Sequence, residues 1–214
     1  MSDERILLVE DDGILAIHLQ DLLERQGYAV MKPIASGEEA IIIAKQQKPA
    51  LILMDIELGG KMNGITAAEK ITAEYDIPII FLTGFSHDPL LQQAKFAAPY
   101  GYLVKPVPER ELAATIEMAL YKHQLDHQVK ASESKYRSLI EQASDGIFLS
   151  DPMGCYLEVN SAGCDLLGYT HDEILKLNVS DLIPPEDMAT KPLRMPENTR
   201  GVSIRKEKRM KRKD

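Results

Sequence analysis

Five short apolar segments in the first half of the chain constrain its fold more than any other feature. They lie at residues 5–10, 28–35, 50–55, 78–83 and 101–104. Each has the length of a strand, and segments with helical spacing of apolar residues separate them. Continuous apolar runs of this kind are typical of parallel strands that are buried on both faces. The pattern therefore predicts an α/β domain with a doubly wound, five-stranded parallel sheet.

Polar residues follow these strands at one end of the predicted sheet. Active sites in such folds lie beyond the carboxyl ends of the strands. The residues found there are Glu10, Asp11 and Asp12 after the first strand, Asp55 ending the third, Thr83 ending the fourth and Lys105 after the fifth. Carboxylates gathered in one pocket repel one another, and a hard cation such as Mg²⁺ would offset that repulsion. Asp12 is better placed to cap the following helix than to bind metal.

These residue types are the ones that phosphoryl transfer requires. The reaction needs an in-line nucleophile, a metal ion on the phosphoryl oxygens and donors for the developing charge. Asp55 can be the nucleophile, and Glu10 and Asp11 can be the metal-binding acids. The hydroxyl of Thr83 and the ammonium of Lys105 can hold the remaining phosphoryl oxygens.

Four segments in register resemble the receiver domain of two-component response regulators, which has a flavodoxin-like fold. They are ILLVEDD, LILMDIEL, IIFLTG and GYLVKPV, within residues 4–122. The resemblance implies that Asp55 is the phosphoacceptor and forms an aspartyl phosphate. It also implies a Mg²⁺ or Mn²⁺ site made by Glu10, Asp11, Asp55 and the backbone carbonyl of Glu57. A histidine kinase or a phosphotransfer protein would be the phosphodonor.

The same resemblance assigns roles to three further residues. Thr83 and Tyr102 would be the switch residues, and Lys105 would bind the phosphoryl group. Ordinary packing is the less favoured interpretation of Tyr102. The peptide bond before Pro106 is expected to be cis, which proline makes accessible. Phe85 would lie over the pocket, and a helix is predicted near residues 89–97.

Residues 135–187 have a different character. The segments IFLSD and YLEVN are two short strands joined by a turn at 152–154. Together with D-G-I, Asn160, L-L-G-Y and D-L-I-P-P-E-D they resemble a PAS sensor domain. We therefore predict a receiver at 1–122, a helical connector at 123–143 and a partial α+β PAS domain at 144–214. No ligand of the PAS pocket is indicated, and the pocket could be a protein-interaction surface instead.

The connector is predicted to continue the last receiver helix and to give way to a new helix near Ser132 or Ser134. His123 and His127 stand four residues apart, a spacing that suits a metal ion. The sequence shows no third ligand, however, so a solvated helix face is the favoured interpretation. A homodimer could form through the receiver face or through this connector.

Charge is distributed unevenly along the chain. The net charge is −8, yet residues 200–214 carry eight basic and two acidic side chains. The acidic remainder argues against nucleic-acid binding by the main domain. Residues 202–214 match a PAS strand that is normally followed by two more, so we expect the front part of a longer protein, such as a sensor kinase. The alternative is a basic tail that binds nucleic acid or another acidic partner.

No apolar run approaches the ~20 residues that a membrane span requires, and the N-terminus lacks the pattern of a signal peptide. We therefore expect a cytoplasmic signalling protein that catalyses only its own phosphorylation and slow dephosphorylation. A docking or dimerisation receiver that is never phosphorylated, with a PAS ligand as the input, is the alternative. A phosphatase with a nucleophilic Asp ranks last, since MDIEL lacks the D-x-D pair of that class.

Overall fold

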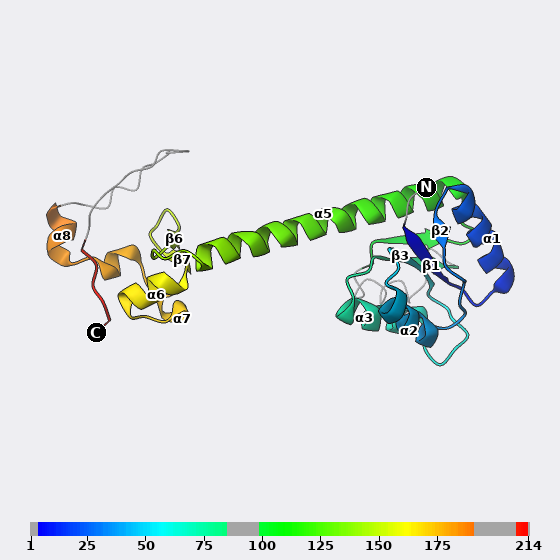
Figure 1. Ribbon diagram of the computed structural model, residues 1–214, viewed down its shortest axis with the longest axis horizontal. Coiled ribbons are helices and arrows are strands. Elements are labelled where there is room, and N and C mark those ends of the chain that lie inside the picture. The colour runs from blue at the N-terminus through cyan, green and yellow to red at the C-terminus, as the bar shows by residue number, and fades with distance from the viewer. Residues whose placement is uncertain (1–3, 85–98, 191–208, 214) are drawn as a thin grey trace. The chain divides into compact units, whose positions relative to one another are not determined.

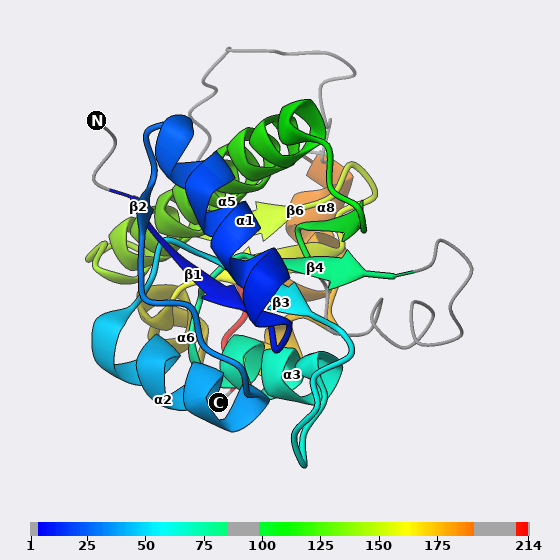
Figure 2. The same cartoon turned by 90° about the vertical axis from the view of Figure 1, so that its right-hand side faces the viewer.

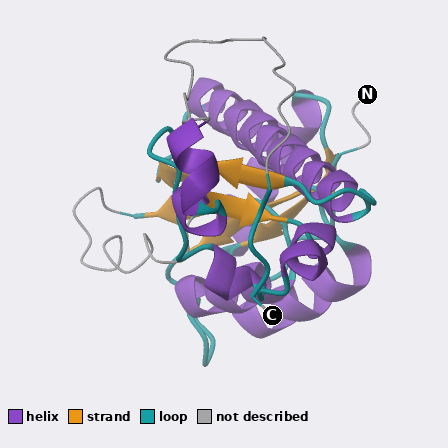
Figure 3. Cartoon of the chain, turned by 90° about the vertical axis from the view of Figure 1, so that its left-hand side faces the viewer, coloured by secondary structure: helices purple, strands orange, loops and turns teal. Residues whose placement is uncertain are grey.

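The computed structural model describes residues 4–84, 99–190 and 209–213 of the 214-residue chain. The chain forms two compact units, residues 1–129 and 130–214 (Figure 1). Figure 3 distinguishes the helices from the strands of both units. None of the described helices combines the length and the apolar character that crossing a membrane would demand. Phe85 and the helix predicted near residues 89–97 lie outside the described residues.

The first unit contains the predicted five-stranded parallel sheet. Its strands are in the order β2-β1-β3-β4-β5, which is the doubly wound arrangement. The strands are β1 (Arg5–Val9), β2 (Ala29–Val30), β3 (Leu51–Asp55), β4 (Ile79–Thr83) and β5 (Gly101–Val104). The predicted strand at 28–35 is too long, because only its first part pairs regularly with β1. Pro33, which has no backbone N–H, lies between this part and an isolated bridge at Ile34.

Helices cover both faces of this sheet (Figure 2). Alternate residues of β1 point to opposite faces, as strand geometry requires. Ile6 and Leu8 pack with α1 (Gly13–Arg25) and with the first turns of α5 (Glu109–Glu141). Leu7 and Val9 pack with α2 (Gly37–Gln47) and α3 (Gly64–Glu74). The central strands are therefore buried on both sides, which is why they read as unbroken apolar runs.

Helix α5 runs without interruption over 33 residues. The prediction of a new helix starting near Ser132 or Ser134 is therefore wrong. Neither glycine nor proline occurs between residues 109 and 141, so no residue type breaks the helix. The polar stretch in its middle changes the exposure of the helix and leaves its backbone geometry intact.

The second unit is a small α+β fold. Strands β6 (Phe148–Ser150) and β7 (Tyr156–Val159) form the predicted antiparallel hairpin. They are followed by α6 (Ser161–Leu167), α7 (His171–Ile174), the 3₁₀ helix η2 (Val179–Leu182) and α8 (Pro185–Thr190). The buried apolar core consists of Tyr156, Val159, Leu167, Ile174 and Leu182.

Asn160 is the fully buried polar centre of this unit. Its Nδ2 donates to the carbonyl oxygens of Ile140 and Asp145, at 3.0 and 2.9 Å. Its Oδ1 accepts from the backbone N–H groups of Ile147 and Gly163, at 2.8 and 2.9 Å. One side chain thus joins the last turn of α5, the segment before β6 and the start of α6.

The described part of the basic tail, residues 209–213, contacts the second unit without forming a strand. This differs from the prediction for 202–214, of which 202–208 lie outside the described residues. The backbone N–H of Lys211 donates to the carbonyl of Leu182 at 2.8 Å instead of entering a strand ladder. Arg209 forms a bidentate pair with Asp187, at 2.7 and 3.0 Å. The charges of Arg209 and Lys213 are therefore directed at acidic side chains of the same unit, Asp187 and Glu173.

Candidate functional site

Three carboxyl groups meet at the carboxyl edge of the parallel sheet. Glu10 and Asp11 follow β1, and Asp55 ends the neighbouring strand β3. Ligand oxygens from all three lie within 4.8 Å of one another. Glu10 and Asp55 are only 3% and 4% exposed, whereas Asp11 is exposed. The structure thus brings together the acids that the sequence placed at two separate strand ends.

Lys105 completes this cluster from the end of β5. Its Nζ lies 2.6 Å from Glu10 Oε2 and 2.7 Å from Asp55 Oδ2. Burial raises the pKa of Glu10, and the nearby Asp55 raises it further, although Lys105 acts in the opposite direction. Burial by itself lowers the pKa of Lys105, but the hydrogen bonds to Asp55 and Glu10 outweigh it, so this pKa is raised. The ammonium therefore stays charged between the two acids.

Backbone groups hold the carboxylates in place. The N–H of Glu57 donates to Asp55 Oδ1 at 3.2 Å, and the N–H of Gly59 donates to Asp11 Oδ2 at 3.0 Å. Asp12 caps α1 as predicted, because its Oδ1 accepts from the N–H groups of Ile14 and Leu15. Asp12 is accordingly engaged by the helix and is not part of the carboxylate cluster.

Gly64 is a residue of the site that the sequence analysis missed. It is the first residue of α3, and its N–H donates to the carbonyl of Ile56 at 3.0 Å. A Cβ atom at this position would overlap the backbone carbonyl oxygen of Asp55. Glycine thus allows α3 to begin directly against the strand end that carries Asp55. In the sequence, Gly64 stands out only as one glycine of a turn-rich loop. Such a glycine can be needed for the turn itself or for close approach of another backbone group, and the sequence does not separate the two.

The other predicted residues lie on the strands beside this cluster. Thr83 ends β4 and is 1% exposed. The backbone N–H of Lys105 donates to the carbonyl of Thr83 at 2.8 Å. The peptide bond between Lys105 and Pro106 is cis.

Tyr102 is half-buried on β5, and its ring stacks on Phe81 with 6.0 Å between the ring centroids. Its hydroxyl is buried and has no hydrogen-bond partner among the described residues. Burial also raises the pKa of this phenol. The ring is therefore packed, but its buried hydroxyl lacks a hydrogen bond among the described residues, which costs free energy of folding.

The donor set fits a hard divalent cation. Mg²⁺ is usually held by a few carboxylate oxygens and keeps water sites that phosphate can occupy. Glu10 Oε2 is buried and accepts no well-aligned hydrogen bond within the described parts of the chain, although it forms the ion pair with Lys105. Glu10, Asp11 and Asp55 would hold such a cation. The backbone carbonyl of Glu57 as a further ligand stays a prediction.

Comparison with known families agrees with this geometry. The family model of the response regulator receiver domain matches residues 6–117, and that of the PAS fold matches residues 134–213. The transcriptional regulatory protein PdtaR of Mycobacterium tuberculosis is 32% identical over 138 residues, covering 64% of this chain and 65% of the relative. YvrH of Bacillus subtilis, also a transcriptional regulatory protein, is 36% identical over 120 residues, covering 56% of this chain and 50% of the relative. The chain thus spans between half and two thirds of the length of these two relatives.

Solved structures show the same likeness. A signal receiver domain of a modulated diguanylate cyclase from Desulfovibrio desulfuricans is 38% identical, with a TM-score of 0.55, and the match covers 57% of this chain and 97% of that one. The N-terminal domain of a response regulator/sensory box/GGDEF three-domain protein from Carboxydothermus hydrogenoformans is 33% identical, with a TM-score of 0.54, and covers 57% and 98%. The chain therefore belongs to the response regulator receiver family of two-component signalling, and a PAS domain follows its receiver.

Proposed function

We propose that Asp55 accepts a phosphoryl group from a histidine kinase or a phosphotransfer protein in a Mg²⁺-dependent reaction. The observation that carries this proposal is the position of Lys105 Nζ, 2.7 Å from Asp55 Oδ2 and inside a cluster of three carboxylates. A nucleophilic carboxylate beside a fixed ammonium and a cation-binding set is what phosphoryl transfer needs.

In the proposed reaction a carboxylate oxygen of Asp55 attacks the phosphorus atom of the donor. The new oxygen–phosphorus bond forms as the bond between phosphorus and the donor's imidazole nitrogen breaks, and the imidazole leaves with the electron pair. Lys105 then binds a phosphoryl oxygen, and the hydroxyl of Thr83 donates to another. Glu10, Asp11 and Asp55 would hold Mg²⁺, which when bound would neutralise negative charge on the phosphoryl oxygens.

The added charge would act as the signal. The acyl phosphate carries close to two negative charges where the Asp55 carboxylate carried one, so the site gains about one negative charge near Lys105. Movement of Thr83 toward the phosphoryl group would open space near Tyr102, whose buried hydroxyl is unsatisfied. A second position of Tyr102 would then change the face formed by β4 and β5, and the PAS domain would receive the signal through α5.

We also propose that the protein acts in the cytoplasm and forms a homodimer through the receiver face or α5. Its PAS pocket would serve as a protein-interaction surface. In the described part of the tail, residues 209–213, Arg209 contacts Asp187 of its own unit, so we propose no separate role of the tail in nucleic-acid binding.

Intact-mass spectrometry of the protein incubated with acetyl phosphate and Mg²⁺ tests the proposal. Wild type should gain the mass of one phosphoryl group, and chelation of Mg²⁺ should prevent the gain. Asp55→Asn should gain nothing. Asp12→Asn is the matched control, because asparagine also caps helices and the neighbouring acid is otherwise unchanged. Equal labelling of wild type and Asp55→Asn would refute the proposal. A wild type that binds Mg²⁺ and is labelled by neither acetyl phosphate nor a phosphorylated kinase would favour the docking alternative.

A further inference from the structure

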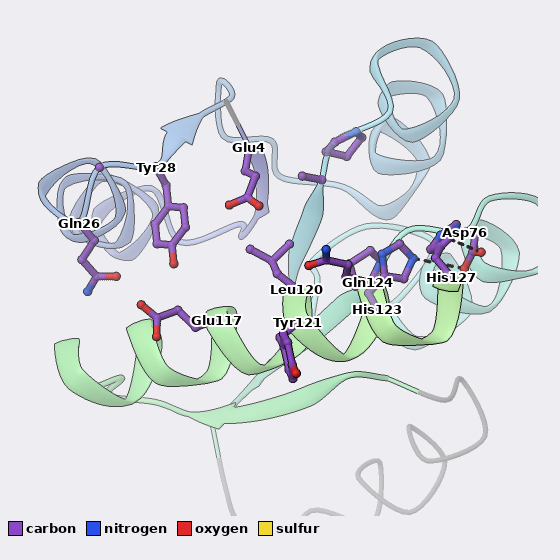
Figure 4. A pocket seen from close by; sticks show the side chains of 14 residues that line it. Glu4, Gln26, Tyr28, Asp76, Glu117, Leu120, Tyr121, His123, Gln124 and His127 are labelled. Carbon is purple, nitrogen blue, oxygen red and sulfur yellow. Dashed lines mark hydrogen bonds and ion pairs between the residues drawn. The ribbon is translucent and has the colours of Figure 1, made fainter. Parts of the chain in front are cut away.

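A cleft of about 1030 Å³ lies at the amino edge of the receiver sheet, opposite the edge that carries Asp55. The starts of β1 to β4 form one wall of it, and α5 forms the other (Figure 4). Polar and charged side chains make up much of its lining, and Leu120 and Pro78 are among the apolar residues there. At one end of the cleft, metal-ligating side chains from two distant parts of the sequence come together.

These side chains are Asp76, His123 and His127. The two histidines stand one turn apart on α5, so their imidazoles lie on the same face of the helix. Asp76 comes from the connection between α3 and β4. Its Oδ1 lies 3.3 Å from His123 Nε2, and its Oδ2 lies 3.1 Å from His127 Nε2 (Figure 4). Asp76 is the third ligand that the spacing of the histidines alone does not reveal.

The distances, which join each histidine to a different oxygen of Asp76, are compatible with a metal coordination site. In a tetrahedral Zn²⁺ site with metal–ligand bonds of about 2.0 Å, neighbouring ligand atoms lie about 3.3 Å apart. The two distances from Asp76 to the histidines have this size, and the ligand atoms of all three residues lie within 4.8 Å of one another. The three side chains are therefore close enough for one cation to contact all of them.

A neighbouring aromatic group fixes one of the imidazoles. The ring of His123 meets the ring of Tyr100 edge to face, with 5.4 Å between the centroids. The hydroxyl of Tyr100 donates to Asp126 Oδ2 at 3.1 Å, which ties that ring to the same helix. His123 is only 17% exposed, and its ring also lies 4.5 Å from that of His127. This packing limits the orientations that His123 can adopt, as the outer shell of a metal site does.

We propose that Asp76, His123 and His127 bind a divalent transition-metal ion of the Zn²⁺ class. Two imidazoles and one carboxylate suit Zn²⁺, whereas Mg²⁺ prefers oxygen ligands only. Water from the open cleft would fill the remaining coordination position. The bound ion would clamp residues 123–127 of α5 to the connection between α3 and β4. It would thereby restrict the motion of residues 123–127 of α5 relative to the receiver sheet.

Zn²⁺ titration of the full chain, with excess Mg²⁺ present to occupy the acidic cluster at Asp55, tests the proposal. Binding is measured by competition with a chromogenic chelator and, with Co²⁺, by the visible absorption of a tetrahedral centre. One ion per chain should bind to wild type. His127→Ala and Asp76→Asn should each weaken binding by about tenfold or more, and His123→Ala/His127→Ala should abolish it. His127 is half-exposed, so its variant should fold normally, which circular dichroism checks.

His18→Ala and His171→Ala are the matched controls, because both histidines are exposed and lie outside this cluster. Both should bind Zn²⁺ as wild type does. Wild type that binds no Zn²⁺ would overturn the proposal. So would a His123→Ala/His127→Ala variant that binds with wild-type affinity, or a loss of affinity in either control as large as in His127→Ala. In those cases the contacts of Asp76 with the two histidines are ion pairs that hold no metal ion.

Discussion

Lys105 Nζ lies 2.7 Å from Asp55 Oδ2 and, at the same time, 2.6 Å from Glu10 Oε2. Both carboxyl groups are almost fully buried, and the lysine side chain is 19% exposed. The ammonium thus compensates two acids that would otherwise repel each other in a site of low dielectric. It also occupies the oxygens that a divalent cation would use. If a divalent cation binds here, its binding would be coupled to stability through the side chain of Lys105.

Lys105→Met should destabilise the protein in the absence of divalent cations and should bind Mg²⁺ more tightly than wild type does. Removing one partner of a buried ion pair costs about 3 kcal/mol of unfolding free energy. The loss of a positive charge at the same time removes repulsion toward Mg²⁺. Urea unfolding with and without Mg²⁺ measures both effects. Lys45, an exposed residue of α2, provides the control, and Lys45→Met should change neither stability nor Mg²⁺ binding. Equal stability of Lys105→Met and wild type in the presence of chelator would contradict the prediction.

Gly64→Ala should disrupt the site, because the new Cβ would overlap the carbonyl oxygen of Asp55. Relief of the overlap requires a shift of α3 or of the end of β3, and we expect a loss of about 2 kcal/mol or more. Labelling by acetyl phosphate should fall as well. Gly13→Ala is the control, since nothing lies within 4 Å of a Cβ there and alanine favours a helix. It should leave labelling unchanged and stability equal or slightly higher.

The second unit should lose stability at acid pH through Glu141. Hydrogen bonds from the hydroxyl and the N–H of Ser161 lower the pKa of Glu141 below its ordinary 4.5. A depressed pKa contributes stability that is present above the unfolded value and is lost as the pH falls through the folded value. Glu141→Gln should therefore flatten the dependence of stability on pH below 4.5. Thermal unfolding across that range checks this, with Glu133→Gln as the control on the same helix.

Asn160→Ala should destabilise the second unit strongly. The substitution removes four hydrogen bonds, two in which Asn160 donates and two in which it accepts, and leaves buried backbone groups without partners. We expect a loss of about 3 kcal/mol or more. Hydrogen exchange should rise at residues 140–163 and stay unchanged in the receiver sheet. Ser134→Ala, on the exposed part of α5, is the control and should leave hydrogen exchange unchanged in both units.

Helix α5 should mediate the proposed homodimer. Leu125, Val129, Tyr136 and Leu139 are between 42% and 66% exposed, and their spacing of four, seven and three residues places them on one stripe. Such a stripe is typical of the seam of a two-stranded coiled coil, and Ser132 would be a polar interruption in it. Val129→Lys/Leu139→Lys should give a monomer in analytical ultracentrifugation. Gln128→Lys should leave the association state unchanged, and a wild-type monomer at high concentration would rule out this seam.

The amino-acid sequence by itself determined the receiver fold and the edge at which its polar residues gather. Apolar runs of strand length dictate a sheet buried on both faces, and parallel strands necessarily bring their carboxyl ends to one edge. Local chemistry was equally readable, as in the cap that Asp12 forms on α1. The hairpin of the second unit could likewise be predicted, because its turn residues lie next to its strands in the sequence. These features depend on residues that are near in sequence or on a rule that applies to every parallel sheet.

Tertiary structure decided the features that depend on packing between distant segments. Asp76 meets His123 and His127 only because α5 packs beside the connection that precedes β4. Gly64 matters because α3 begins against the backbone of Asp55. Periodicity reports the face of a helix or strand that is buried, but it does not report the partner residue on that face. For this reason the sequence could indicate two of the proposed metal ligands, and only the folded chain supplied the third.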